Sequence, residues 1–154
     1  MDDAVSRADA HAPLPPERAA LWSGYGQWDE VYFPRLVGVV VEDVRVDYCR
    51  MRVPWRSELT QPAGVVHDGA IAALVDSVVV PAIGSGYDDR RAFATVDLQL
   101  QYRGAVVQED MVGEGWVTVR GRSIVFCEAE VVTASGRPVA KGMLTYRVLG
   151  PQQG

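Results

Sequence analysis

The sequence predicts an α+β domain in which a curved antiparallel sheet of about six strands wraps around one long central helix. Three observations lead to this prediction. Residues 64–86 read as one helix that is apolar on nearly every side, which is typical of a buried helix. Two strand-like segments precede it and four follow it, and the short turns between the last strands favour antiparallel neighbours. The apolar face of that sheet is the one surface available to cover the helix.

The chain of 154 residues suits a single domain with its own core. Residues 1–16 are rich in proline and alanine, and we expect a flexible N-terminal tail there. Residues 17–150 then form the one domain. The sequence contains no apolar run of 18 residues and its first residues are acidic, which argues against a transmembrane helix or a signal peptide. A cytoplasmic location is the default prediction.

Charge and cysteine content exclude several functions. The net charge of −5 argues against a general nucleic-acid binder. Cys49 and Cys127 do not make a disulfide framework, and no Cys/His cluster indicates a metal site. Lys141 is the only lysine, so the remaining basic residues are arginines, which suit bidentate contacts to phosphate groups.

Four segments lie ahead of the central helix. Residues 17–21 are expected to begin a short helix after two prolines. Residues 22–34 are aromatic and contain glycine, which fits either a packed loop or the lid of a pocket. Residues 35–53 read as two strands. Residues 55–63 are polar with a proline, which indicates a loop.

The central helix carries its own boundary signals. Asp68 lies near the start, where a carboxylate interacts favourably with the positive end of the helix dipole. Pro81 lacks a backbone donor and is expected to kink or terminate the last turn. Gly84 and Gly86 are expected to end the helix.

The strands after the helix begin with the clearest alternation in the chain. Apolar residues at 94, 96, 98, 100 and 102 alternate with polar residues at 95, 97, 99 and 101, which predicts a strand with one buried face. The remaining predicted strands are 111–120, 123–133 and 137–149, joined by turns at 120–122 and 135–136.

Three polar residues in and before the helix have ordinary structural explanations when each is taken alone. Asp76 would be unfavourable in an apolar helix unless it is paired or functional, and pairing with an arginine or a backbone cap is the more common case. His67 alone fits a hydrogen-bonding structural role. Gln61 alone fits a solvated loop residue.

Taken together, these residues resemble a known active site. The pattern Q-x5-HDGA-x5-D over residues 61–76 resembles the active-site segment of hotdog-fold acyl-CoA thioesterases. The most similar clade is the PaaI-like one, which includes hydroxybenzoyl-CoA and phenylacetyl-CoA thioesterases. The later segments TVDLQLQYRGA, RGRSIVFCEAEV and GRPVAKGMLTYRVL are similar to the family's last strands. The resemblance covers residues 35–149 and implies a hotdog fold and thioester hydrolase activity.

The resemblance also implies roles for individual residues. The backbone amides of Asp68 and Gly69 would lie at the helix N-terminus, near the thioester oxygen that becomes negative in the transition state. Asp76 matches the carboxylate that attacks the carbonyl or activates water. Three further positions match residues that organise the loop or orient water or the thioester: His67, Gln61 and Thr95.

One residue departs from the family pattern, because the usual His-Gly-Gly reads His-Asp-Gly here. A side chain of Asp68 that points away from the site would leave the oxyanion-binding amide intact, whereas one that points inward would impair hydrolysis. A non-catalytic module that binds acyl-CoA or acyl-carrier protein is therefore the alternative function. A hotdog hydratase is disfavoured because the chain has no Asp-x-Asn-Pro-x-His segment.

Helix geometry predicts a composite site. Asp68 and Asp76 are eight residues apart, so their Cα atoms are separated by about 12 Å along one helix. One thioester carbonyl cannot reach both groups of the same chain. Two antiparallel helices side by side would bring Asp76 of one protomer to the helix start of the other. The mechanism therefore requires a homodimer, and the resemblance implies the same, often as a dimer of dimers.

The predicted ligand is the acyl-CoA substrate itself, with no separate cofactor and no metal. The acyl group is expected to be aromatic or of medium length, and Tyr32, Phe33 and Trp55 are either pocket residues or core residues. The resemblance places CoA phosphate contacts near the later turns, at Arg103, Arg120, Gly121, Arg122 and Lys141.

Overall fold

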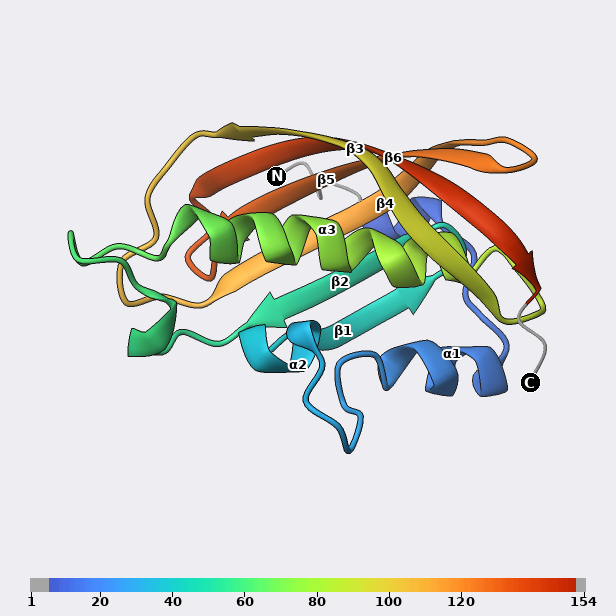
Figure 1. The fold of residues 1–154 in the computed structure, drawn as a ribbon, viewed down its shortest axis with the longest axis horizontal. Coiled ribbons are helices and arrows are strands. Elements are labelled where there is room, and N and C mark those ends of the chain that lie inside the picture. The colour runs from blue at the N-terminus through green and yellow to red at the C-terminus, as the bar shows by residue number, and fades with distance from the viewer. Residues whose placement is uncertain (1–5, 152–154) are drawn as a thin grey trace.

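The computed structural model describes residues 6–151, in which six antiparallel strands form one curved sheet along a central helix (Figure 1). The strands are β1 (Val40–Arg45), β2 (Tyr48–Val53), β3 (Arg91–Tyr102), β4 (Met111–Arg120), β5 (Ile124–Thr133) and β6 (Pro138–Pro151). The α-helices are α1 (Pro16–Ser23), α2 (Phe33–Val37) and α3 (Asp68–Gly84), and short 3₁₀ helices span Arg7–Ala10 and Ser57–Leu59. The sheet order is β1-β2-β4-β5-β6-β3. The predicted α+β class, a hotdog arrangement, is confirmed.

Helix α3 is the buried centre of the fold. Leu74, Val75, Val78 and Val79 are fully buried, and burial of each such side chain contributes about 1.5–3 kcal/mol. Glycines on the facing strands let the helix approach the sheet closely. For example, a Cβ on Gly115 would lie 2.9 Å from the Val78 side chain. None of the helices within residues 6–151 is long and apolar enough to span a membrane.

The helix ends at Gly84, one of the two glycines predicted to end it, and it does not stop at Pro81 itself. Pro81 lies inside α3, which continues to Gly84 and is followed by the C-cap residue Ser85. Pro81 has no N–H to donate to the Ser77 carbonyl four residues earlier, so the helix forgoes that one bond and continues for three more residues. The Ser85 hydroxyl donates to the Ala82 carbonyl at 2.7 Å and its amide donates to the Pro81 carbonyl at 2.8 Å, which satisfies the end of the helix.

The first strand begins later than predicted. Residues 35–37, predicted to begin the first strand, belong to α2 instead, and β1 starts only at Val40. Pro34 lies in the first turn of α2, where its fixed φ suits a helix. Gly38 ends α2 in the left-handed region at φ 90°, as glycine commonly does at a helix end.

Strand β3 contains a β-bulge that changes the predicted alternation. Thr95 pairs with Tyr146 and Asp97 pairs with Thr145, so Val96 is the extra residue. Residues after the bulge keep the predicted pattern, with Leu98 and Leu100 partly buried. Before the bulge, each side chain points to the face of the sheet opposite to the predicted one, because one extra residue reverses the period-2 alternation. Thr95 therefore faces the helix side of the sheet.

The described part of the N-terminal segment packs on the other side of the sheet. Ala8 is buried with Tyr48 and Trp116, and the Arg7 guanidinium lies 3.5 Å from the centre of the Trp116 ring. Trp116 follows Gly115, which faces α3, so it lies on the face away from that helix. Residues 6–16 are thus docked on the sheet, while residues 1–5 of the predicted tail lie outside the described residues.

Candidate active site

The start of α3 presents one free backbone donor. His67 is the N-cap, and its Nδ1 accepts the Gly69 N–H at 2.8 Å. The Ala70 N–H donates to the His67 carbonyl at 2.9 Å. The Asp68 N–H has no acceptor in the part of the chain that the structure describes. Of the two predicted oxyanion amides, that of Asp68 is therefore open and that of Gly69 is engaged.

The sequence His-Asp-Gly explains this arrangement. A Cβ at position 69 would lie 2.9 Å from the His67 Nδ1 atom, so glycine lets the ring approach its amide. Because Nδ1 accepts the hydrogen bond, the neutral ring carries its proton on Nε2. The histidine thus fixes the first turn, in keeping with its predicted organising role. The Asp68 side chain is exposed and makes no hydrogen bond or ion pair within residues 6–151.

A short loop positions His67. The His67 N–H donates to the Leu59 carbonyl at 2.7 Å, and Thr60 forms an isolated bridge with Val66. Gln61 closes the loop, because its Oε1 accepts the Ala63 N–H at 3.0 Å. The structure shows no hydrogen bond between the Gln61 side chain and either His67 or Asp68, so its proposed orienting role is not supported by a contact within one chain.

Asp76 is held by two hydroxyl groups on a single oxygen. Its Oδ1 accepts from the Tyr146 hydroxyl at 2.5 Å and from the Thr95 hydroxyl at 3.0 Å. Among residues 6–151, no donor reaches its Oδ2. The bulge in β3 makes this arrangement possible, since it turns Thr95 toward the helix. One carboxylate oxygen is therefore fixed and the other is open for chemistry.

Tyr146 is a site residue that the sequence pattern does not predict. Burial and the negative charge of Asp76 raise the pKa of its phenol well above the ordinary value, so the hydroxyl remains a proton donor. A buried tyrosine needs a polar partner and so does a carboxylate in an apolar helix. The sequence therefore indicates only that Asp76 and a buried tyrosine each need a polar partner. It does not indicate that Asp76 and Tyr146 are partners of each other.

Asp76 also stands on the one side of α3 that the sheet leaves uncovered. Beyond Ala70, every residue of the helix is buried except Ala72, Asp76 and Val80. These three lie one turn apart on the same face. The Cα atoms of Asp68 and Asp76 are about 12 Å apart along the helix. One chain therefore presents two separated halves of the predicted catalytic group.

Arg120 is engaged structurally rather than free for a ligand. Its Nη2 donates to Asp47 Oδ1 at 2.5 Å and to the Ile83 carbonyl at 3.0 Å, and its guanidinium lies 4.6 Å from the Tyr87 ring centre. A cation at the carbonyl end of α3 is favourable because that end of the helix dipole is negative. The sequence could not distinguish this arginine from an exposed turn residue.

The other predicted phosphate contacts are spread over two regions. Arg103 is exposed and donates to Gln101 Oε1 at 2.8 Å, and Lys141 lies 3.5 Å from the nearest carboxylate oxygen of Glu130. Arg103 and Lys141 line one shallow surface groove. Gly121 and Arg122 lie in the exposed turn after β4. No cluster of three or more potential metal ligands occurs within residues 6–151.

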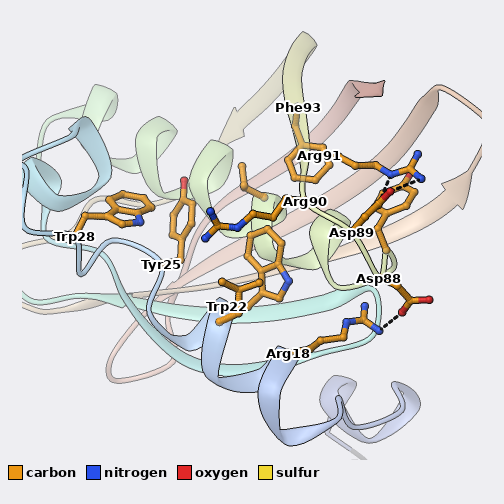
Figure 2. A pocket seen from close by; sticks show the side chains of 12 residues that line it. Arg18, Trp22, Tyr25, Trp28, Asp88, Asp89, Arg90, Arg91 and Phe93 are labelled. Carbon is orange, nitrogen blue, oxygen red and sulfur yellow. Dashed lines mark hydrogen bonds and ion pairs between the residues drawn. The ribbon is translucent and has the colours of Figure 1, made fainter. Parts of the chain in front are cut away.

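Two pockets lie at the two ends of α3. The first, of about 390 Å³, adjoins the helix start and is lined by His67, Gly69 and apolar residues that include Phe33 and Leu36 of α2. Phe33 is thus a pocket residue, whereas Tyr32 and Trp55 line neither pocket. The second, of about 270 Å³, lies between α1, the C-terminal half of α3 and the start of β3 (Figure 2).

Several solved protein structures have the same fold as this chain. A conserved protein of Pseudomonas aeruginosa matches with 29% identity and a TM-score of 0.72, over 78% of this chain and 95% of that chain. The PaaI protein of the E. coli phenylacetic acid degradation operon matches with 12% identity and a TM-score of 0.76, over 86% and 95% of the two chains. A hypothetical thioesterase of Streptococcus pneumoniae, solved with coenzyme A, matches with 18% identity and a TM-score of 0.69, over 75% and 89%.

Sequence comparison gives the family. No curated protein sequence matches the chain significantly. The family model described as "Thioesterase superfamily" matches residues 63–140. The match includes the helix start, Asp76 and Thr95, and it spans half of the chain. The protein therefore belongs to the thioesterase superfamily and is a thioester hydrolase.

Proposed function

We propose that this protein hydrolyses an aromatic or medium-chain acyl-CoA thioester in a site shared by two protomers. Asp76 of one protomer and the Asp68 N–H of its partner act on the same carbonyl. The observation that carries this proposal is the pair of open groups on α3: a fixed carboxylate with a free Oδ2, and a free amide at the helix start. They are too far apart in one chain to meet at one carbonyl.

The chemistry follows from these two groups. The Asp76 carboxylate either attacks the thioester carbonyl to form a mixed anhydride or takes a proton from an attacking water. The negative charge on the carbonyl oxygen is stabilised by the Asp68 N–H at the positive end of the helix dipole. In both routes water supplies the hydroxyl of the acid product, and the CoA thiolate leaves and takes up a proton.

The side chain of Asp68 is compatible with this role. It is exposed, and the helix cap is made by His67 instead. A solvated carboxylate is strongly screened, so its charge opposes an oxyanion at the adjacent amide only weakly. This supports hydrolysis over the alternative of a module that only binds acyl-CoA or acyl-carrier protein.

Two surfaces support a dimer in which helices lie side by side. The partly exposed stripe Ala72, Asp76 and Val80 offers small and apolar side chains around the carboxylate. Strand β3 is a sheet edge of 12 residues whose Val96 and Tyr102 are largely exposed. A long exposed edge strand with apolar side chains readily pairs with another chain. Pairing two copies of β3 would extend the sheet and place the two α3 stripes on one side of it.

The CoA phosphates are proposed to contact the basic residues that remain exposed, Arg103 and Arg122, with Lys141 beside the groove that Arg103 lines. Arginine guanidinium groups bind phosphate oxygens in a bidentate manner. Arg120 is not included, because Asp47 and the end of α3 hold its Nη2 and its remaining nitrogen atoms are buried.

Thiol release from a panel of acyl-CoA substrates tests this function. We expect CoA to be released from aromatic or medium-chain thioesters, by a protein whose mass in solution is that of a dimer or a dimer of dimers. The assay uses Ellman's reagent, with mass measured by light scattering at the assay concentration. Tight acyl-CoA binding without thiol release would contradict hydrolysis and support a module that only binds acyl-CoA. A monomer that turns over normally would contradict the shared site.

A further inference from the structure

The pocket at the C-terminal end of α3 has aromatic walls. It lies between α1, the turn that follows α1, the end of α3 and the start of β3 (Figure 2). Its volume of about 270 Å³ suits a group of the size of a substituted benzene ring rather than a whole CoA molecule. The aromatic residues that line it are Trp22, Tyr25, Trp28, Tyr87 and Phe93.

These walls are held in place by their neighbours. The Tyr25 and Trp28 rings meet edge to face with centroids 5.0 Å apart, and the Tyr87 and Phe93 rings are stacked at 6.4 Å. Trp22 lies directly against Gly84, where any Cβ would overlap the indole ring. Flat aromatic walls favour a planar ring, which can stack or pack edge to face against them.

One charged side chain that lines this pocket, Arg90, has no partner within the described residues. Arg18 pairs with Asp88 at 3.0 Å, and Arg91 pairs with Asp89 at 2.7 Å. Arg90 has no ion pair or side-chain hydrogen bond within residues 6–151, and its guanidinium points into the pocket toward Tyr25 and Trp22 (Figure 2). A free guanidinium beside aromatic walls suits a carboxylate, which it binds through two parallel hydrogen bonds.

The pocket begins one helical turn beyond Asp76, which does not itself line it. Val80 lines it and lies one helical turn beyond Asp76, about 6 Å along the axis. On β3, Phe93 lines it and lies two residues before Thr95, on the same face of the strand. Burial, and to a lesser degree the negative charge of Asp76, raise the pKa of Tyr25 to about 12, so this phenol stays protonated in the pocket.

We infer that this pocket receives the acyl part of the substrate, and that the acyl group is an aromatic ring carrying a carboxylate remote from the thioester, which Arg90 binds. This inference rests on the proposed function. With the thioester carbonyl at Asp76, the ring lies between Val80 and Phe93 and its far substituent extends toward Arg90. A medium-chain alkyl group would fill the same space but would leave the guanidinium without a partner.

Substrate preference and its dependence on Arg90 test the inference. We compare kcat/KM for 4-carboxybenzoyl-CoA, benzoyl-CoA and octanoyl-CoA. The wild type is expected to prefer 4-carboxybenzoyl-CoA over benzoyl-CoA by about tenfold or more, as for one charge-assisted hydrogen-bonded pair. Arg90→Gln is expected to remove that preference while changing the value for benzoyl-CoA by less than about threefold. Because Arg90 is exposed, this substitution is not expected to affect folding.

A matched control is Arg147→Gln, which removes an exposed arginine on the outer face of β6; this residue does not line the pocket and lies on the other side of the sheet. We expect it to retain the full preference for the carboxylated substrate. Hydrolysis of all three substrates without preference, or a preference that persists in Arg90→Gln, would overturn the inference and leave the proposed function standing.

Binding of free acids separates the inference from hydrolysis. Trp22 and Trp28 line the pocket, so their fluorescence reports occupancy by benzene-1,4-dicarboxylate or benzoate. We expect tighter binding of the dicarboxylate in the wild type and in Arg147→Gln, and equal binding in Arg90→Gln. That result in a protein that releases no thiol would uphold the pocket and refute the proposed hydrolysis. Equal binding of both acids by the wild type would refute the pocket assignment.

Discussion

Replacing Asp76 with asparagine is expected to lower kcat by about a thousandfold or more. Asparagine keeps an oxygen that accepts from Tyr146 and Thr95, so the local hydrogen bonds can persist. It provides neither a nucleophile nor a base, and both proposed routes need one. KM is expected to change little, because the substituted atom is not needed to bind CoA.

This prediction is checked by steady-state thiol release, with circular dichroism and solution mass as measures of folding and assembly. Asp97→Asn is the matched control, because Asp97 is exposed on the same strand as Thr95 and pairs with Thr145 on the outer face. We expect the control to retain wild-type kcat. Near-normal turnover by Asp76→Asn would show that this carboxylate does not take part in the reaction.

The second large effect is expected from Asp68→Pro, which removes the proposed oxyanion donor together with the exposed carboxylate. Position 68 is the first residue of α3, where proline is well tolerated. The preceding His67 has φ −63° and ψ 135°, which a residue before proline readily adopts. Loss of one oxyanion donor is expected to lower kcat by about a hundredfold or more.

Asp68→Ala separates the amide from the side chain. It removes the carboxylate but keeps the N–H, so we expect kcat to stay near wild type or to rise because a negative charge has left the site. The loss of helix-dipole stabilisation is expected to be below about 1 kcal/mol in both variants, which thermal unfolding measures. Equal losses of kcat in Asp68→Pro and Asp68→Ala would show that the backbone donor is not responsible.

The sequence was sufficient to predict the central elements of the fold. The apolar segment that became α3 could only be buried, and the alternating segments after it could only cover it as an antiparallel sheet. The sequence also placed His67 just before the helix start and Asp76 within the helix, as the structure has them. These features follow from local patterns that the tertiary structure keeps everywhere except at the β3 bulge.

Other features depend on contacts between distant residues. The bulge at Val96, which turns Thr95 toward Asp76, is a shift in the register with β6, a strand more than 40 residues later in the chain. The hydrogen bond from Tyr146 joins positions 70 residues apart. Arg120 is engaged because Asp47 and the end of α3 meet it in space. Sequence periodicity carries no information about such pairings.

A heterodimer of two inactive variants tests the shared site most directly. Asp76→Asn and Asp68→Pro chains, each with a different affinity tag, are co-expressed, and the mixed dimer is purified through both tags. One of its two sites then combines an intact Asp76 with an intact Asp68 amide. If each site draws on both protomers, the mixed dimer has about half of the wild-type kcat per dimer. If Asp76 and the Asp68 amide of one chain serve the same site, the mixed dimer is as inactive as either parent, and the account is contradicted.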